Sequence, residues 1–131
     1  MLTLVPLMIV PFIGYNAILL TGGSAAGWAS PVMSFTMISG GVWELTIGDI
    51  ILVVALLCLF VEILKSTRTS NASVVDHLLS TLVFVAFLVE FLVVEGAATS
   101  VFFICMVMSL IDLMAGFSVS IRSAGRDVSL N

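Results

Sequence analysis

Charged residues are scarce in this sequence: they make up 9% of its 131 residues, whereas 61% are hydrophobic. Soluble globular domains carry charge on roughly a quarter of their residues, so this composition excludes a soluble globule. The basic residues number only four, too few to neutralise the phosphates of a nucleic acid. We therefore expect an integral membrane protein with the lipid bilayer as its surroundings and no nucleic-acid partner.

Cysteines and catalytic motifs are equally sparse. Cys58 and Cys105 both lie within apolar stretches, where a thiol behaves as a small hydrophobic group. Their spacing predicts neither a disulfide framework nor a metal site. The chain has no nucleophile elbow, phosphate-binding glycine loop or zinc-metallopeptidase pattern. We therefore expect a protein that is not an enzyme and that needs no cofactor or metal.

Long apolar runs dominate what is there, and a membrane-spanning helix needs about 20 such residues. The expected fold is an all-α membrane protein, a four-transmembrane-helix bundle in a single domain covering residues 1–131. The predicted spans are residues 2–20, 47–64, 74–94 and 98–121. An outer loop at 21–46, an inner loop at 65–73 and a polar tail at 122–131 complete the chain.

The first run contains Pro6 and Pro11. Proline removes a backbone donor and pushes against the preceding turn, so this span is expected to be a kinked helix or a helix that begins late. No basic residue precedes the run, so we read it as an uncleaved anchor and not as a signal peptide.

The outer loop carries a different pattern. Apolar and polar residues alternate over residues 33–37, and an apolar stretch resumes at 42–45 after Gly40 and Gly41. Alternation on both sides of a glycine pair is typical of a hairpin, since glycine supplies the positive φ angles of tight turns. We predict a short β-hairpin on the membrane surface. An interfacial or re-entrant helix is the alternative.

The basic residues predict the orientation. Lys65 and Arg68 follow the second span, and Arg122 and Arg126 follow the fourth. With four spans these two segments share a side, which the positive-inside rule identifies as the cytoplasm. Both termini are then cytoplasmic, while the hairpin faces out.

Acidic residues within apolar runs are costly and require a reason. Asp112 is the deepest, and it lies on a helix face of small residues that favours close packing. We expect it to hydrogen-bond a neighbouring helix, with a proton or cation role as the alternative. The residues of this face are Cys105, Ser109, Asp112, Gly116 and Ser120.

Glu62 shares a heptad-spaced face of the second span with Gly48 and Ala55, which again predicts close helix packing. Lys65 follows Glu62 by three residues. Residues at this spacing are neighbours on a helix, so a local ion pair is expected.

Four further polar residues need an explanation. Asp76 fits a capping box with Ser73 at the start of the third span. Asp49 and Glu90 lie near the outer ends of their spans, where they either reach the interface or share a proton as a pair. His77, the sole histidine, is a candidate entry point for protons to these acids.

The stretches LFVEILKSTRT, SVVDHLLSTLVF and IRSAGRD, at residues 59–69, 73–84 and 121–127, suggest a relationship. Together with the layout of four short spans, they resemble small uncharacterised inner-membrane proteins of bacteria. The resemblance implies a bacterial inner-membrane location and no particular activity.

Two functions agree with these features. The first is a non-catalytic accessory or assembly subunit of a larger membrane complex, or a homo-oligomer joined through the small-residue faces of the second and fourth spans. The alternative is an oligomeric proton-coupled transporter or cation pathway that uses Asp112 and Glu62, with Glu90 or Asp49.

Overall fold

The computed structural model describes residues 5–21, 25–66 and 71–129. These parts of the chain form four helices and a two-stranded antiparallel hairpin. The helices are α1 (Ile9–Leu20), α2 (Ile47–Ser66), α3 (Asn71–Val93) and α4 (Ser100–Ser129). The strands are β1 (Pro31–Thr36) and β2 (Val42–Thr46), and two short 3₁₀ turns are η1 (Ala25–Ala29) and η2 (Glu95–Ala97).

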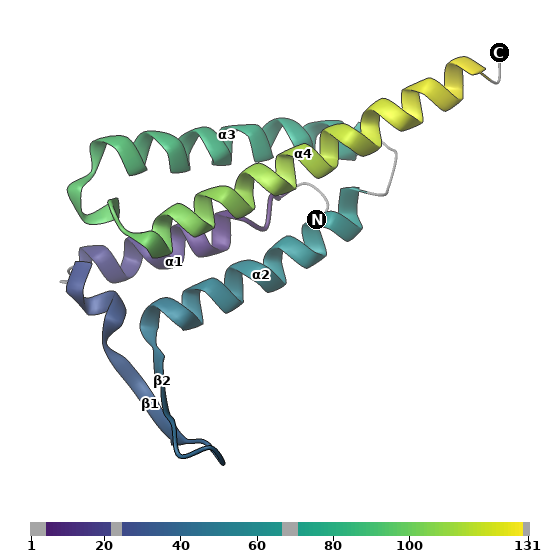
Figure 1. Ribbon diagram of the computed structural model, residues 1–131. Coiled ribbons are helices and arrows are strands. Elements are labelled where there is room, and N and C mark those ends of the chain that lie inside the picture. Colours follow the sequence, from purple (N-terminus) through teal and green to yellow (C-terminus); the bar gives the residue numbers. More distant parts are fainter. Residues whose placement is uncertain (1–4, 22–24, 67–70, 130–131) are drawn as a thin grey trace.

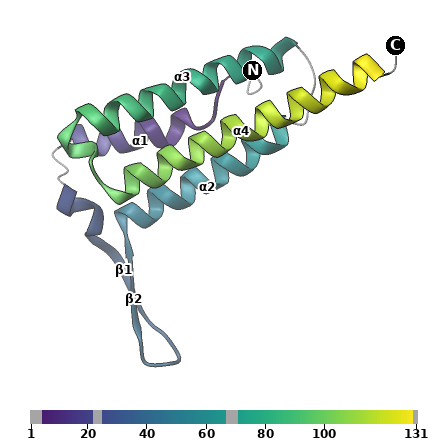
Figure 2. The same cartoon turned by 45° about the horizontal axis from the view of Figure 1, so that its top comes forward.

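The four helices lie side by side as a bundle (Figure 1). Helix α4 packs against both α2 and α3, while α1 packs mainly against α2. We call the end where α2 stops and α3 starts the inner end, and the opposite end, from which the hairpin leaves, the outer end. The start of α1 and the C-terminal half of α4 also lie toward the inner end (Figures 1 and 2).

Three of the predicted spans are confirmed as helices that are long and apolar enough to cross a membrane. The qualifying segments are Ile47–Lys65, Val74–Val93 and Ser100–Ser118. Large apolar side chains are exposed along them, including Leu57, Phe60, Leu78 and Leu92. Such a surface is unfavourable in water and suited to lipid, which is consistent with an integral membrane protein.

The first predicted span is shorter than expected. Helix α1 has 12 residues, or about 18 Å at 1.5 Å per residue, against a hydrocarbon core about 30 Å thick. Pro6 precedes the helix, and Pro11 is its third residue, where a backbone N–H would have no partner within the helix. The prolines therefore delay the start of the helix and do not kink it. Residues 1–4 of the predicted span lie outside the described parts.

The predicted β-hairpin is confirmed. Phe35 pairs with Trp43 and Ser34 with Glu44 in an antiparallel register. Gly40 adopts a φ of 90°, and its N–H donates to the Met37 carbonyl at 2.9 Å. A residue with a side chain is strained at this angle, so glycine permits the tight turn. Strand β2 then leads directly into α2.

An aromatic core fills the outer half of the bundle. The rings of Tyr15 and Trp28 stack at 4.0 Å, and Phe102 meets Tyr15 at 4.8 Å and Phe87 at 5.2 Å. The Tyr15 hydroxyl donates to the Gly96 carbonyl at 2.9 Å. This bond connects α1 to the α3–α4 turn, because a buried phenol needs a polar partner.

Two predicted boundaries differ from the structure. Helix α3 begins at Asn71, so Ser73 lies inside the first turn and is not the N-cap of a capping box with Asp76. Helix α4 continues through the predicted polar tail as far as Ser129. Its 30 residues make it about 45 Å long.

We predict that Gly48→Ala weakens the contact between α2 and α4. A Cβ atom at Gly48 would come within 2.8 Å of the Val101 Cγ2 and 3.0 Å of the Trp28 carbonyl oxygen. Overpacking lowers the stability by about 1–3 kcal/mol. The higher helix propensity of alanine offsets up to about 1 kcal/mol of this loss. Thermal unfolding in detergent should therefore show a net loss of about 1–2 kcal/mol.

The control for this change is Gly27→Ala. No atom lies within 4 Å of a Cβ placed at Gly27, so its effect should stay within about 0.5 kcal/mol. Equal stability of the two variants would contradict close packing at Gly48.

Candidate functional site

A cluster of ionisable side chains lies buried toward the inner end of the bundle. Helix α2 supplies Glu62 and Lys65, α3 supplies Asp76, and α4 supplies Asp112. The three acidic residues are only 2%, 5% and 4% exposed, respectively. We call these four residues the inner polar cluster. Burying so many charged groups is costly unless they neutralise one another.

Lys65 is the centre of the cluster. Its Nζ lies 2.9 Å from Glu62 Oε1 and 3.2 Å from Asp76 Oδ1. It also donates to the Val5 carbonyl oxygen at 2.7 Å. The predicted ion pair between Glu62 and Lys65 is thus present. It is part of a larger network that joins α2, α3 and the segment before α1.

The segment before α1 is attached to the cluster at a second point. The backbone N–H of Leu7 donates to Glu62 Oε1, the same oxygen that accepts from Lys65. Leu7 precedes α1, so its N–H has no acceptor within that helix. The buried carboxylate of Glu62 is a strong acceptor for this N–H. Sequence patterns do not reveal these bonds, because the groups from the N-terminal segment belong to the backbone.

Asp112, from α4, faces the other three residues of the inner polar cluster. Glu62, Asp76 and Lys65 are close enough to act on its charge, and the Ser80 hydroxyl faces it from α3. Asp112 Oδ2 is nevertheless buried without a hydrogen-bond partner, as are the hydroxyls of Ser80 and Ser109. Buried polar atoms without partners are uncommon and call for an explanation.

The small-residue faces predicted on the second and fourth spans are used within one chain. Gly48 packs on Val101 of α4, and Ala55 is fully buried. On α4 the buried members of the stripe are Cys105, Ser109, Asp112 and Gly116. Ser120 lies in α4, but its side chain is outside the described part. The described members of these faces bring α2, α3 and α4 together within one chain.

His77 does not join the carboxyl groups as a metal site. Its ring packs against Gly116, so closely that a Cβ atom there would overlap it. It also lines a pocket of about 300 Å³ with Val74, Leu78, Thr81 and Phe117. Within the described ranges, no group of three or more histidine, cysteine, aspartate or glutamate residues is placed to hold a metal ion.

Asp49 and Glu90 lie near the outer end and have separate surroundings. Thr46 and Asp49 form a capping box at the start of α2: Asp49 Oδ2 accepts from the Thr46 N–H at 3.0 Å, and the Asp49 N–H donates to Thr46 Oγ1 at 3.1 Å. Asn16 of α1 lies beside Glu90, whose Oε2 is buried without a partner. The predicted sharing of a proton between Asp49 and Glu90 gains no support from these contacts.

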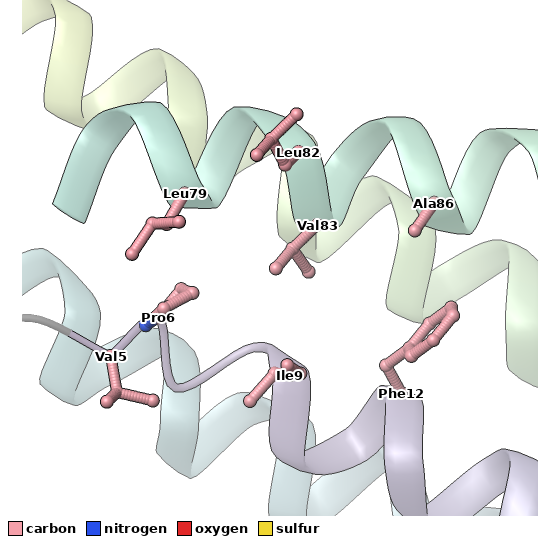
Figure 3. A pocket seen from close by; sticks show the side chains of 8 residues that line it. All are labelled: Val5, Pro6, Ile9, Phe12, Leu79, Leu82, Val83 and Ala86. Carbon is pink, nitrogen blue, oxygen red and sulfur yellow. The ribbon is translucent and has the colours of Figure 1, made fainter. Parts of the chain in front are cut away.

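An apolar groove runs between the start of α1 and α3 (Figure 3). Its volume is about 410 Å³, and all of its lining residues are apolar: Val5, Pro6, Ile9, Phe12, Leu79, Leu82, Val83 and Ala86. The groove offers no side-chain hydrogen bond to a ligand. The inner polar cluster is therefore the better candidate for a chemical role.

Comparison with protein-family models, with curated proteins and with solved structures gave no match. No relative therefore assigns a role to the inner polar cluster or to the hairpin.

We predict that Lys65→Met destabilises the bundle more than Lys65→Arg. Methionine keeps much of the apolar stem but leaves the buried carboxylates of Glu62 and Asp76 without a counter-charge. Removing one partner of a buried ion pair costs about 3–5 kcal/mol. Arginine retains the charge and should lose less. Thermal unfolding in the same detergent measures both, and equal losses would show that Lys65 acts through packing alone.

Proposed function

We propose that this protein is a non-catalytic accessory or assembly subunit of a membrane complex, and that the β1–β2 hairpin binds the partner protein. The observation that supports this is the exposure of the hairpin. All residues from 31 to 44 are exposed, and the hairpin extends away from the helices (Figure 2). A two-stranded hairpin is marginally stable alone and gains most from a surface to pack against.

The hairpin has one mainly apolar face. Met33 pairs with Leu45, and Phe35 pairs with Trp43, so these four side chains share a face of the ribbon. The rings of Phe35 and Trp43 stack at 5.7 Å. Tryptophan, phenylalanine and methionine are enriched in protein interfaces and supply much of their binding energy. Ser34, Thr36 and Glu44 make the opposite face more polar.

A partner of another sequence is favoured over self-association. The homo-oligomer hypothesis relied on the small-residue faces, and those faces pack between helices of one chain. The hairpin provides an apolar surface outside that packing. The partner suited to it is a protein with an apolar groove at the outer membrane surface that can accept the Phe35 and Trp43 rings.

We also propose that the protein resides in the bacterial inner membrane with both termini in the cytoplasm. Lys65 lies in the last turn of α2 and Arg68 follows that helix in the sequence, while Arg122 and Arg126 lie in the last part of α4. The bundle brings the end of α2 and the C-terminal half of α4 toward one end (Figure 1). A common location for the basic residues is what the positive-inside rule requires of the cytoplasmic side.

The partner proposal predicts that Phe35→Ala with Trp43→Ala releases the companion protein. Removing two central aromatic anchors should weaken binding by about a thousandfold, because such residues each contribute about 2 kcal/mol and each 1.4 kcal/mol is about tenfold in affinity. The measurement is gentle extraction through a C-terminal tag, followed by mass determination of the intact assembly. Wild type should carry a stoichiometric companion that the variant loses.

The matched control is Leu57→Ala with Phe60→Ala. These α2 side chains are 63% and 62% exposed and lie on the bundle outside the hairpin, so the companion should stay bound. Retention of the companion by the hairpin variant, or recovery of copies of this chain alone, would contradict the proposal.

The orientation is tested by cysteine labelling. Ser34→Cys should react with a membrane-impermeant maleimide in intact cells, because Ser34 is an exposed hairpin residue on the proposed outer side. Ser123→Cys, within the C-terminal RSAGRD segment, should react only after lysis. The unsubstituted chain measures the background from Cys58 and Cys105. The reverse pattern would overturn the orientation.

A further inference from the structure

One carboxyl oxygen of Asp112 is buried at the inner polar cluster without a partner, which packing does not explain. The residue is 4% exposed, and its Oδ2 has no hydrogen-bond partner. The other polar groups of the inner polar cluster are engaged: Lys65 binds Glu62 and Asp76, and Glu62 also accepts from Leu7. Asp112 is the acid of the cluster for which the described residues provide no ion pair.

The charges of the cluster do not balance. Glu62, Asp76 and Asp112 could carry three negative charges, whereas Lys65 carries one positive charge, which would leave two negative charges in a buried site. Carboxylates that share such a site cannot all ionise, and one of them retains its proton. Since Lys65 lies directly against Glu62 and Asp76, Asp112 is the residue on which a proton is best retained.

Every helix packed around Asp112 contributes to this environment. Glu62 and Lys65 face it from α2, and Asp76 and Ser80 face it from α3. The His77 ring lies against Gly116, about one turn further along α4. The N-terminal segment adds no side-chain charge, because its bonds to Lys65 and Glu62 come from the Val5 carbonyl and the Leu7 N–H.

Two hydroxyl groups can serve the ionised state of Asp112. Ser80 faces it from α3, and Ser109 lies one turn earlier on the same face of α4. Both hydroxyls are buried and have no partner. A carboxylate accepts hydrogen bonds that a hydroxyl donates, so rotation of these groups would stabilise Asp112 after it loses its proton.

A proton fits this site better than a metal ion. The Lys65 ammonium already lies between Glu62 and Asp76, where a cation would have to bind. In the parts of the chain that the structure describes, no three potential ligands converge as a metal requires. A proton needs only one carboxyl oxygen to bind and has no coordination shell.

We propose that the inner polar cluster is a proton-binding site in which Asp112 holds an exchangeable proton. On release, the O–H bond of Asp112 breaks, and the proton passes to the carboxylate of Asp76 or Glu62 and then to solvent at the inner end. Asp112 then becomes the carboxylate. Uptake is the reverse, so the site binds one proton per chain without any other reactant.

The test is infrared spectroscopy of the full chain in lipid nanodiscs from acid to alkaline pH. A protonated carboxyl group has a C=O band distinct from that of a carboxylate. Wild type should show this band at neutral pH and lose it as the pH rises. Labelling of all aspartate carboxyl groups with ¹³C should shift the band, whereas labelling of glutamate should leave it in place.

Asp112→Asn should abolish the component of the band that persists at neutral pH, and Asp49→Asn should retain it, since the Asp49 carboxylate is part of the capping box at the start of α2. If Asp112→Asn fails to fold, the isotope labelling of wild type still shows whether the band belongs to an aspartate or to a glutamate. Absence of the band in wild type at neutral pH, its shift with labelled glutamate alone, or its persistence in folded Asp112→Asn would each overturn the proposal.

This proton site does not depend on the partner proposed for the hairpin. Loss of the companion protein is read by mass, and loss of the exchangeable proton is read by infrared absorption. The two proposals therefore fail separately.

Discussion

The structure depends on the need to neutralise charge inside an apolar bundle. Lys65 meets this need with a single ammonium group that binds Glu62, Asp76 and the Val5 carbonyl. Because water is excluded, each of these groups would be costly to bury alone. The network therefore fixes the end of α2, the start of α3 and the segment before α1 relative to one another.

The bundle uses different interactions at its two ends. Toward the outer end, stacked aromatic rings and the Tyr15 hydroxyl hold α1 against the turn between α3 and α4. Toward the inner end, ion pairs and backbone bonds replace them. Helix α4 contacts α2 and α3 along this length, because Gly48 and Gly116 let side chains of neighbouring helices approach closely. The helices are thus held mainly by aromatic packing toward the outer end and by ion pairs and hydrogen bonds toward the inner end.

We assign functions to two of the features that have no partner within the described parts of the chain. The hairpin has an apolar face that the bundle does not cover, and Asp112 has a carboxyl oxygen that the cluster does not bind. One is a surface and the other a buried group, so they call for different ligands. A partner protein suits the first, and a proton suits the second.

Features that depend on local residue pattern could be predicted without the structure. Long apolar runs predicted three helices, although α4 continues eight residues beyond its predicted end. Alternation around Gly40 predicted the hairpin, because both periodicities reflect backbone geometry. The spacing of Glu62 and Lys65 predicted their ion pair for the same reason. The prolines left a choice between a kink and a late start, and the fold resolved it by placing Pro11 in the first turn of α1.

Which groups from distant parts of the chain meet could not be predicted in this way. The bonds from Leu7 and Val5 to the cluster span more than 50 residues and use backbone atoms, which no residue pattern records. Three further features also depend on how the helices pack. These are the pairing of Lys65 with Asp76, the position of Asn16 beside Glu90, and the use of the small-residue faces within one chain. Sequence spacing defines the face of a helix, but packing determines what that face contacts.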